Sequence, residues 1–188
     1  SRYLVWVLAL IAATQLATNV LDYLFSGVLE AHFSDQELRT AAIGHVYAAI
    51  DVATLVMNVA AGAVLLWVGV GRVLIVIPVL LAISVFGAML VPGFIAVAVA
   101  KVVNKSMDYS LFRVAKEAVY LPLNNVEKTS GKAVIDILTY RVAKGVASIL
   151  LLVLVAIEAQ DLAIFMVLGL ISIWIWITLK LVREYRKV

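Results

Sequence analysis

Long apolar runs dominate this chain and restrict what it can fold into. Residues 73–90 contain no charged side chain, and residues 3–27 and 162–181 each contain a single one. Overall, 65% of the residues are hydrophobic and 14% are charged, whereas a soluble domain is about half apolar and about a quarter charged. A helix crosses the hydrocarbon core of a bilayer with about 20 mostly apolar residues. We therefore expect an integral membrane protein whose first partner is the lipid bilayer.

The apolar runs predict an all-α, polytopic membrane domain, with the whole chain forming one unit. The glycines at 69 and 71, the Val91-Pro92-Gly93 segment and Pro122 are turn signals that separate the runs. Ser34, followed by Glu37, has the spacing of a capping box, which predicts a short surface helix before the second span. The six predicted spans cover residues 3–27, 41–68, 73–90, 94–120, 132–156 and 162–181.

Lysine and arginine in the loops predict the orientation, because cytoplasmic loops carry an excess of these residues. On this rule both termini are expected in the cytoplasm, and the acidic loop around residue 35 outside. The chain starts at Ser1 without a methionine, so we expect it to be part of something longer or to be processed. The loops on the side of the termini hold ten basic residues, against Arg39 alone on the other side: Arg2, Arg72, Arg113, Lys116, Lys128, Lys132, Lys180, Arg183, Arg186 and Lys187.

Four of the six spans carry polar side chains at helical spacing, and the third and sixth have no ionisable residue in their middle. A charge within a span costs roughly 2.5 to 3.5 kcal/mol on insertion scales, so such residues usually face the bundle interior or a water-filled path. We expect the fourth and fifth spans to meet around a solute, with the third and sixth as lipid-facing padding. The four stripes are Gln15, Asn19, Asp22 and Ser26; Tyr47, Asp51, Thr54 and Asn58; Lys101, Lys105, Asp108 and Phe112; and Asp136, Tyr140 and Lys144 with Arg141 beside them.

Structural interpretations of these residues stay open. Asparagine and glutamine in a membrane helix often serve only helix packing, and Asp51 could be a buried carboxylate paired with one lysine. Four basic residues nearer the span ends are explained by membrane topology or by contacts with lipid headgroups: Arg113, Lys116, Lys128 and Lys132. The deeper charges, Lys105, Asp136, Arg141 and Lys144, favour a functional interpretation.

The sequence argues against an enzyme and against a bound cofactor. It contains no HExxH motif, no phosphate-cradling GxxxxGK[ST] loop and no motif with a serine nucleophile. Two histidines and no cysteine argue against a transition-metal centre. The net charge of +3 is better explained by membrane topology than by nucleic-acid binding.

Several short motifs follow one another in the second half of the chain: NKSMDYSLF at 104–112, KE at 116–117, YLPL at 120–123, GKAVID at 131–136 and RVAKG at 141–145. In this order they resemble the C-terminal half of the ATP/ADP translocases, the nucleotide carriers of plastids and obligate intracellular bacteria. The family pattern is approximately KYSLF, TKEMAYIPL, GKAAID and RLGKSGG. The NVLD segment at 19–22 is similar to the family's N-L-V-E.

The resemblance implies a fold related to the major facilitator superfamily, with twelve helices in two six-helix halves, of which this chain would supply helices seven to twelve. It implies antiport of nucleotides by alternating access. By resemblance, Lys105, Arg141 and Lys144 would bind phosphates, and Asp22 and Asp136 would orient these cations. The polar stripes add Asn19, Asp51 and Asp108 as expected supporting residues. Asp108 stands where the family has a lysine, which makes the path less attractive to a tri- or tetra-anion. A divergent relative in a bacterial inner membrane is expected.

Two functional hypotheses follow. In the first, the chain is half of an alternating-access transporter for an anionic, nucleotide-like solute, and a missing N-terminal half or a second copy completes it. It predicts that Lys144→Ala or Arg141→Ala abolishes uptake while the protein still folds. In the second, the chain is a carrier-derived module that anchors other membrane subunits, without transport.

Overall fold

The computed structural model describes residues 2–122 and 139–185, and both ranges are largely helical. Four helical segments within these ranges are long and apolar enough to cross a membrane: Tyr3–His32, Gln36–Val68, Val70–Leu90 and Gln160–Tyr185. In chain order the elements are α1 (Arg2–His32), α2 (Gln36–Val68), α3 (Val70–Leu90), α4 (Phe94–Met107), the π-helix η1 (Asp108–Phe112), α5 (Arg113–Val119), α7 (Tyr140–Ala156), the 3₁₀-helix η4 (Gln160–Leu162) and α8 (Ala163–Tyr185). The helical class is therefore confirmed, whereas six spans remain a prediction.

The connection between α1 and α2 is shorter than the sequence suggests. Helix α1 continues to His32, and α2 already begins at Gln36. The capping box at Ser34 is wrong, because Asp35 is the N-cap: its Oδ1 accepts hydrogen bonds from the backbone N–H groups of Glu37 (2.7 Å) and Leu38 (3.1 Å). The predicted separate surface helix is thus the first turn of α2.

The turn between α2 and α3 consists of one residue. Gly69 has a φ of 87°, a conformation that other residues rarely adopt, and its N–H donates to the carbonyl of Leu65 (3.0 Å). This confirms a tight turn at the predicted place. Pro78 lies buried inside α3, which runs unbroken to Leu90.

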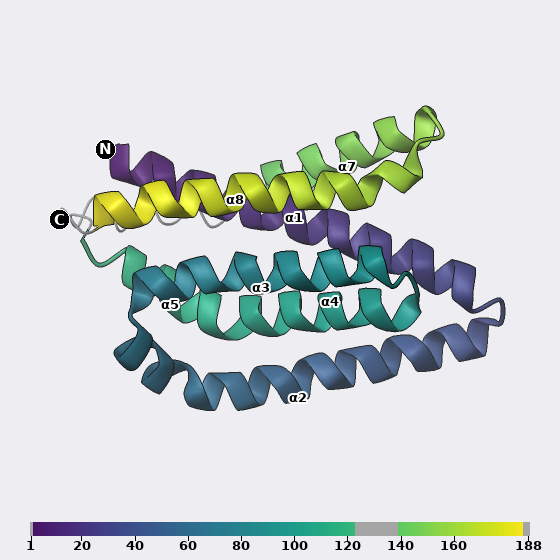
Figure 1. Cartoon of the computed structure of the whole chain (residues 1–188), viewed down its shortest axis with the longest axis horizontal. Helices are drawn as coiled ribbons and strands as arrows, with labels where there is room; N and C mark the ends of the chain where they lie inside the picture. The colour runs from purple at the N-terminus through teal and green to yellow at the C-terminus, as the bar shows by residue number, and fades with distance from the viewer. Residues whose placement is uncertain (1, 123–138, 186–188) are drawn as a thin grey trace.

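Helix α1 is the central element of the fold, and it packs against α4, α7 and α8 (Figure 1). Helix α3 packs on α4 and α8, and α2 lies along α4 and η1. The third and sixth spans therefore supply core side chains, which differs from the expectation of lipid-facing padding. Their largely apolar inner faces bury side chains against neighbouring helices, α8 against α1 and α3, and α3 against α4 and α8. The largest fully buried side chains of this core include Leu10, Ile11, Leu74, Leu81, Ile171 and Trp174.

The predicted fourth span is a continuous helical path with a π-turn in its middle. Helix α4 passes into η1 at Asp108 and then into α5, which ends at Val119 before Pro122, as the proline predicts. Tyr3 at the start of α1 donates a hydrogen bond from its hydroxyl to the carbonyl of Val119 (2.6 Å). The end of α5 thus lies beside the start of α1, at the same end of the molecule as both described termini (Figure 1). Single π-turns inside α-helices frequently mark functional sites.

Candidate functional site

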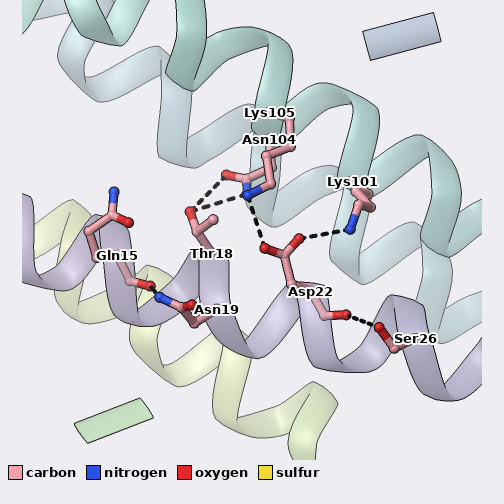
Figure 2. A network of polar contacts seen from close by, with 8 residues as sticks. All are labelled: Gln15, Thr18, Asn19, Asp22, Ser26, Lys101, Asn104 and Lys105. Carbon is pink, nitrogen blue, oxygen red and sulfur yellow. Dashed lines mark hydrogen bonds and ion pairs between the residues drawn. The ribbon is translucent and has the colours of Figure 1, made fainter. Parts of the chain in front are cut away.

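One carboxylate on α1 holds two lysines of α4. Asp22 Oδ1 lies 2.9 Å from Lys101 Nζ, and Asp22 Oδ2 lies 2.9 Å from Lys105 Nζ (Figure 2). Lys101 and Lys105 are four residues apart, which places them one above the other on the same face of the helix. The two oxygens of a single carboxylate can therefore serve both ammonium groups. We call Asp22, Lys101 and Lys105 the ion cluster.

The ion cluster is enclosed by protein on its cationic side. The side chain of Lys101 is 5% exposed and that of Lys105 is 13% exposed, whereas that of Asp22 is 33% exposed. Removing charges from water is costly, and the cost is offset only where opposite charges meet in good geometry. The partly open carboxylate is thus the member of the cluster that an incoming molecule reaches first.

Aromatic faces complete the surroundings of the lysines. The ammonium nitrogen of Lys101 lies 4.3 Å from the ring centroid of Phe25 on α1 and 5.6 Å from that of Tyr47 on α2. The nitrogen of Lys105 lies 6.0 Å from the ring centroid of Tyr109. A cation over an aromatic face gains about 0.5 to 2 kcal/mol, depending on its exposure to solvent. Three helices therefore fix the position of the Lys101 ammonium.

A neutral polar contact continues this interface by one turn. Asn104 Nδ2 donates to Thr18 Oγ1 (3.2 Å), and both side chains are buried. Asn19, by contrast, donates to the carbonyl of Gln15 on its own helix (2.7 Å), as Figure 2 shows. The hydrogen bond of Asn19 therefore stays within α1. The contact between Thr18 and Asn104, by contrast, links α1 to α4.

The other predicted site residues do not join the ion cluster. Asp51 is exposed on α2, and within the described ranges it has no ion pair, so it is not the buried, lysine-paired carboxylate of one interpretation. Arg141 and Lys144 lie on the exposed face of α7, and Asp136 lies outside the described residues. The two described ion pairs thus connect the fourth span with the first, and the predicted meeting of charges from the fourth and fifth spans remains a prediction.

Asp108 has an intermediate position. It begins η1 directly after α4, it is half-buried, and it interacts electrostatically with Lys105 and Lys116. It therefore extends the line of alternating charges from the ion cluster toward the end of α5.

Sequence reasoning missed Lys101, Thr18 and Asn104 as members of the site. The signal for Lys101 was present, because it precedes Lys105 by one helical turn on the polar stripe of the fourth span. In the part of the chain that the structure describes, no group of three histidine, cysteine, aspartate or glutamate side chains could hold a metal ion. The chemistry of the site is that of paired ammonium groups, which suits anionic ligands.

Comparison with known proteins shows which family the amino-acid sequence of this chain matches. The model of the TLC ATP/ADP transporter family matches residues 1–185. The chain is 29% identical over 104 residues to the ADP,ATP carrier protein 3 of Rickettsia conorii, an alignment that covers 52% of this chain and 21% of the relative. It is 31% identical over 105 residues to the ADP,ATP carrier protein 4 of Rickettsia prowazekii, covering 50% of this chain and 20% of the relative.

The chain matches about a fifth of the length of these curated relatives, and no solved structure matches it. The family model, however, extends over nearly the whole chain. This chain belongs to the TLC ATP/ADP transporter family.

Proposed function

We propose that this chain is one half of a membrane transporter that moves an anionic, nucleotide-like solute by alternating access. Membership in a family of ATP/ADP transporters supports the substrate class. The observation that carries the proposal is the ion cluster, in which two enclosed lysines share one partly open carboxylate. Two ammonium groups and one carboxylate leave one positive charge in excess within the cluster, which favours a further anion, and the nearby Asp108 reduces this attraction.

The geometry suggests how the solute binds. Lys101 and Lys105 present two ammonium groups from successive turns of α4, and phosphate oxygens accept charge-assisted hydrogen bonds from such groups. An entering phosphate replaces Asp22 as their partner, and Asp22 turns toward solvent. When the phosphate leaves, the carboxylate returns and both lysines regain an anionic partner. Asp22 thus acts as a substitute anion that keeps the empty site folded.

A second half is required to close the path. Alternating access needs two bodies that rock about a central site, and we propose that a major-facilitator-type partner half or a second copy supplies the other. Asp51 on α2 and Arg141 and Lys144 on α7 support this, because they are charged side chains exposed within helices rich in apolar residues. A water-filled path between the two halves would keep these charged side chains out of contact with lipid.

The orientation in the membrane is part of the proposal. We place the protein in a bacterial inner membrane with both termini in the cytoplasm. The described residues at the two ends of the chain lie at the same end of the bundle (Figure 1), as an even number of spans requires. The same end carries Arg72 and Arg183, in agreement with the distribution of basic residues in cytoplasmic loops.

Uptake into liposomes tests the proposed function. The full-length protein, reconstituted into liposomes, is expected to take up radiolabelled ADP or ATP with saturable kinetics. Uptake should be faster when the liposomes contain unlabelled nucleotide, because the two nucleotides then exchange. Lys144→Ala and Arg141→Ala are expected to abolish uptake without a change in thermal stability, because both side chains are exposed on α7. Absence of uptake and exchange for every nucleotide would favour the structural-module hypothesis instead.

A further inference from the structure

A polar cavity lies along the same helical path as the ion cluster. It has a volume of about 270 Å³ and lies between the η1–α5 segment and the start of α7. Sequence reasoning assigned its two basic residues to topology or lipid contacts, and the proposed transport cycle leaves them without a role. The cavity is lined by Asp108, Tyr109, Phe112, Arg113, Lys116 and Tyr140.

The position of the cavity relates it to the ion cluster. Lys116 follows Lys105 by eleven residues, which is roughly 16 Å along a helix. The hydrogen bond between Tyr3 and Val119 places this end of α5 beside the start of α1, the side that we assign to the cytoplasm. Asp108 connects the two regions, because it lines the cavity and interacts electrostatically with Lys105. A solute that leaves the cytoplasm would therefore meet the cavity before the ion cluster.

The lining of the cavity fits a phosphoryl group. Arg113 is exposed and, in the described ranges, its guanidinium has no ion pair, so its donors are available for the oxygens of a phosphate. Lys116 adds a second cation. Tyr109 and Tyr140, which are 46% and 40% exposed, add hydroxyl donors and aromatic faces. The volume is just below that of typical small-molecule pockets, which start near 300 Å³, and suits a phosphate-bearing head better than a whole nucleotide.

Asp108 limits how strongly the cavity binds an anion. Its carboxylate stands in the wall, and a like charge near the ligand weakens binding. Moderate affinity suits a site from which the solute must move on.

We propose that this cavity is a second anion site, which binds a phosphoryl group at the cytoplasmic end of the path. The same chemistry occurs in a soluble polyphosphate and in a phospholipid headgroup. Binding itself does not depend on transport, whereas the role as an entry station rests on the proposed function.

Pyrophosphate binding to the delipidated, detergent-solubilised protein tests the site by isothermal titration calorimetry. Two classes of site are expected, one weaker than the other. Arg113→Gln should weaken the weaker class about tenfold or more, because a hydrogen bond to a charged group is lost. Asp108→Asn should strengthen it about threefold, since a repelling charge disappears. Arg72→Gln, which removes an exposed arginine from α3, is the matched control and should change neither class.

The outcomes separate this site from the ion cluster. Lys105→Gln should remove the tighter class and leave the weaker one. If Arg113→Gln and Asp108→Asn both leave pyrophosphate binding unchanged, the second site is refuted, while the proposed function stands or falls on uptake. If Lys105→Gln alters neither binding nor uptake, the proposed function fails, and the second site is judged by the Arg113 variant.

Lipid composition identifies the source of the anion. In vesicles that contain phosphatidylglycerol, a headgroup site would show competition with pyrophosphate, and the competition would vanish in Arg113→Gln. Equal binding in vesicles with phosphatidylglycerol and in vesicles of phosphatidylcholine alone would identify a soluble phosphate as the ligand. Either result retains the site and names its occupant.

Discussion

Replacing Asp22 with asparagine is expected to lower the free energy of unfolding by about 3 kcal/mol, the low end of what breaking a buried ion pair costs. The variant keeps the shape of the side chain but removes the negative charge that pairs with Lys101 and Lys105. The two ammonium groups are 5% and 13% exposed, so water cannot replace the lost carboxylate. Thermal or denaturant unfolding in a defined detergent measures the loss.

Asp51→Asn is the matched control for this prediction. Asp51 also lies within a predicted span, but it is exposed on α2 and, in the described part of the chain, has no ion pair. Its substitution should change stability by no more than about 0.5 kcal/mol. Adding Lys101→Met and Lys105→Met to Asp22→Asn should restore most of the stability, because no buried charge remains unpaired. Equal stability of the Asp22 and Asp51 variants would contradict the described cluster.

Lys101→Gln and Lys105→Gln are each expected to reduce nucleotide uptake at least about 30-fold. Removing one partner of a desolvated charge pair costs about 2 kcal/mol or more in binding, which corresponds to about this factor. Initial rates of exchange in proteoliposomes measure the effect. Lys105→Arg should retain more activity than Lys105→Gln, because it keeps the charge but changes the shape of the donor group.

Lys180→Gln is the control for the uptake measurement. Lys180 lies near the end of α8, with its ammonium nitrogen 5.7 Å from the ring centroid of Trp176 and away from α4. Its loss should leave uptake within about twofold of the wild type, since one exposed cation–π contact contributes little. Equal effects at Lys180 and Lys105 would mean that general positive charge, rather than the ion cluster, governs uptake.

The sequence predicted the helical class and most helix ends, because apolar length and turn residues are local properties. Proline at 122 and glycine at 69 mark ends that the structure shows within a few residues. The N-cap was misassigned by one position, because both Ser34 and Asp35 are good caps and only the backbone path selects between them.

The candidate site was predicted in part. Asp22 and Lys105 were identified from their spacing on polar stripes, and the structure brings them into contact. Their pairing with each other could not be read from the stripes, which say which residues share a helix face but not which helices meet. Lys101 was placed on the polar stripe of the fourth span but not among the site residues, and only the packing of α1 against α4 shows that it is enclosed.

The central claim is that a phosphate takes the place of Asp22 at Lys101 and Lys105. Solid-state NMR on protein with ¹³C-labelled aspartate and ¹⁵N-labelled lysine, reconstituted in lipid, measures this directly. Without nucleotide, we predict strong dipolar coupling between the Asp22 carboxyl carbon and both ammonium nitrogens, as their 2.9 Å contacts require. With saturating ADP, this coupling should weaken and coupling of the same nitrogens to ³¹P should appear. Unchanged carbon–nitrogen coupling and no ³¹P coupling, in a preparation that still transports ADP, would contradict the account.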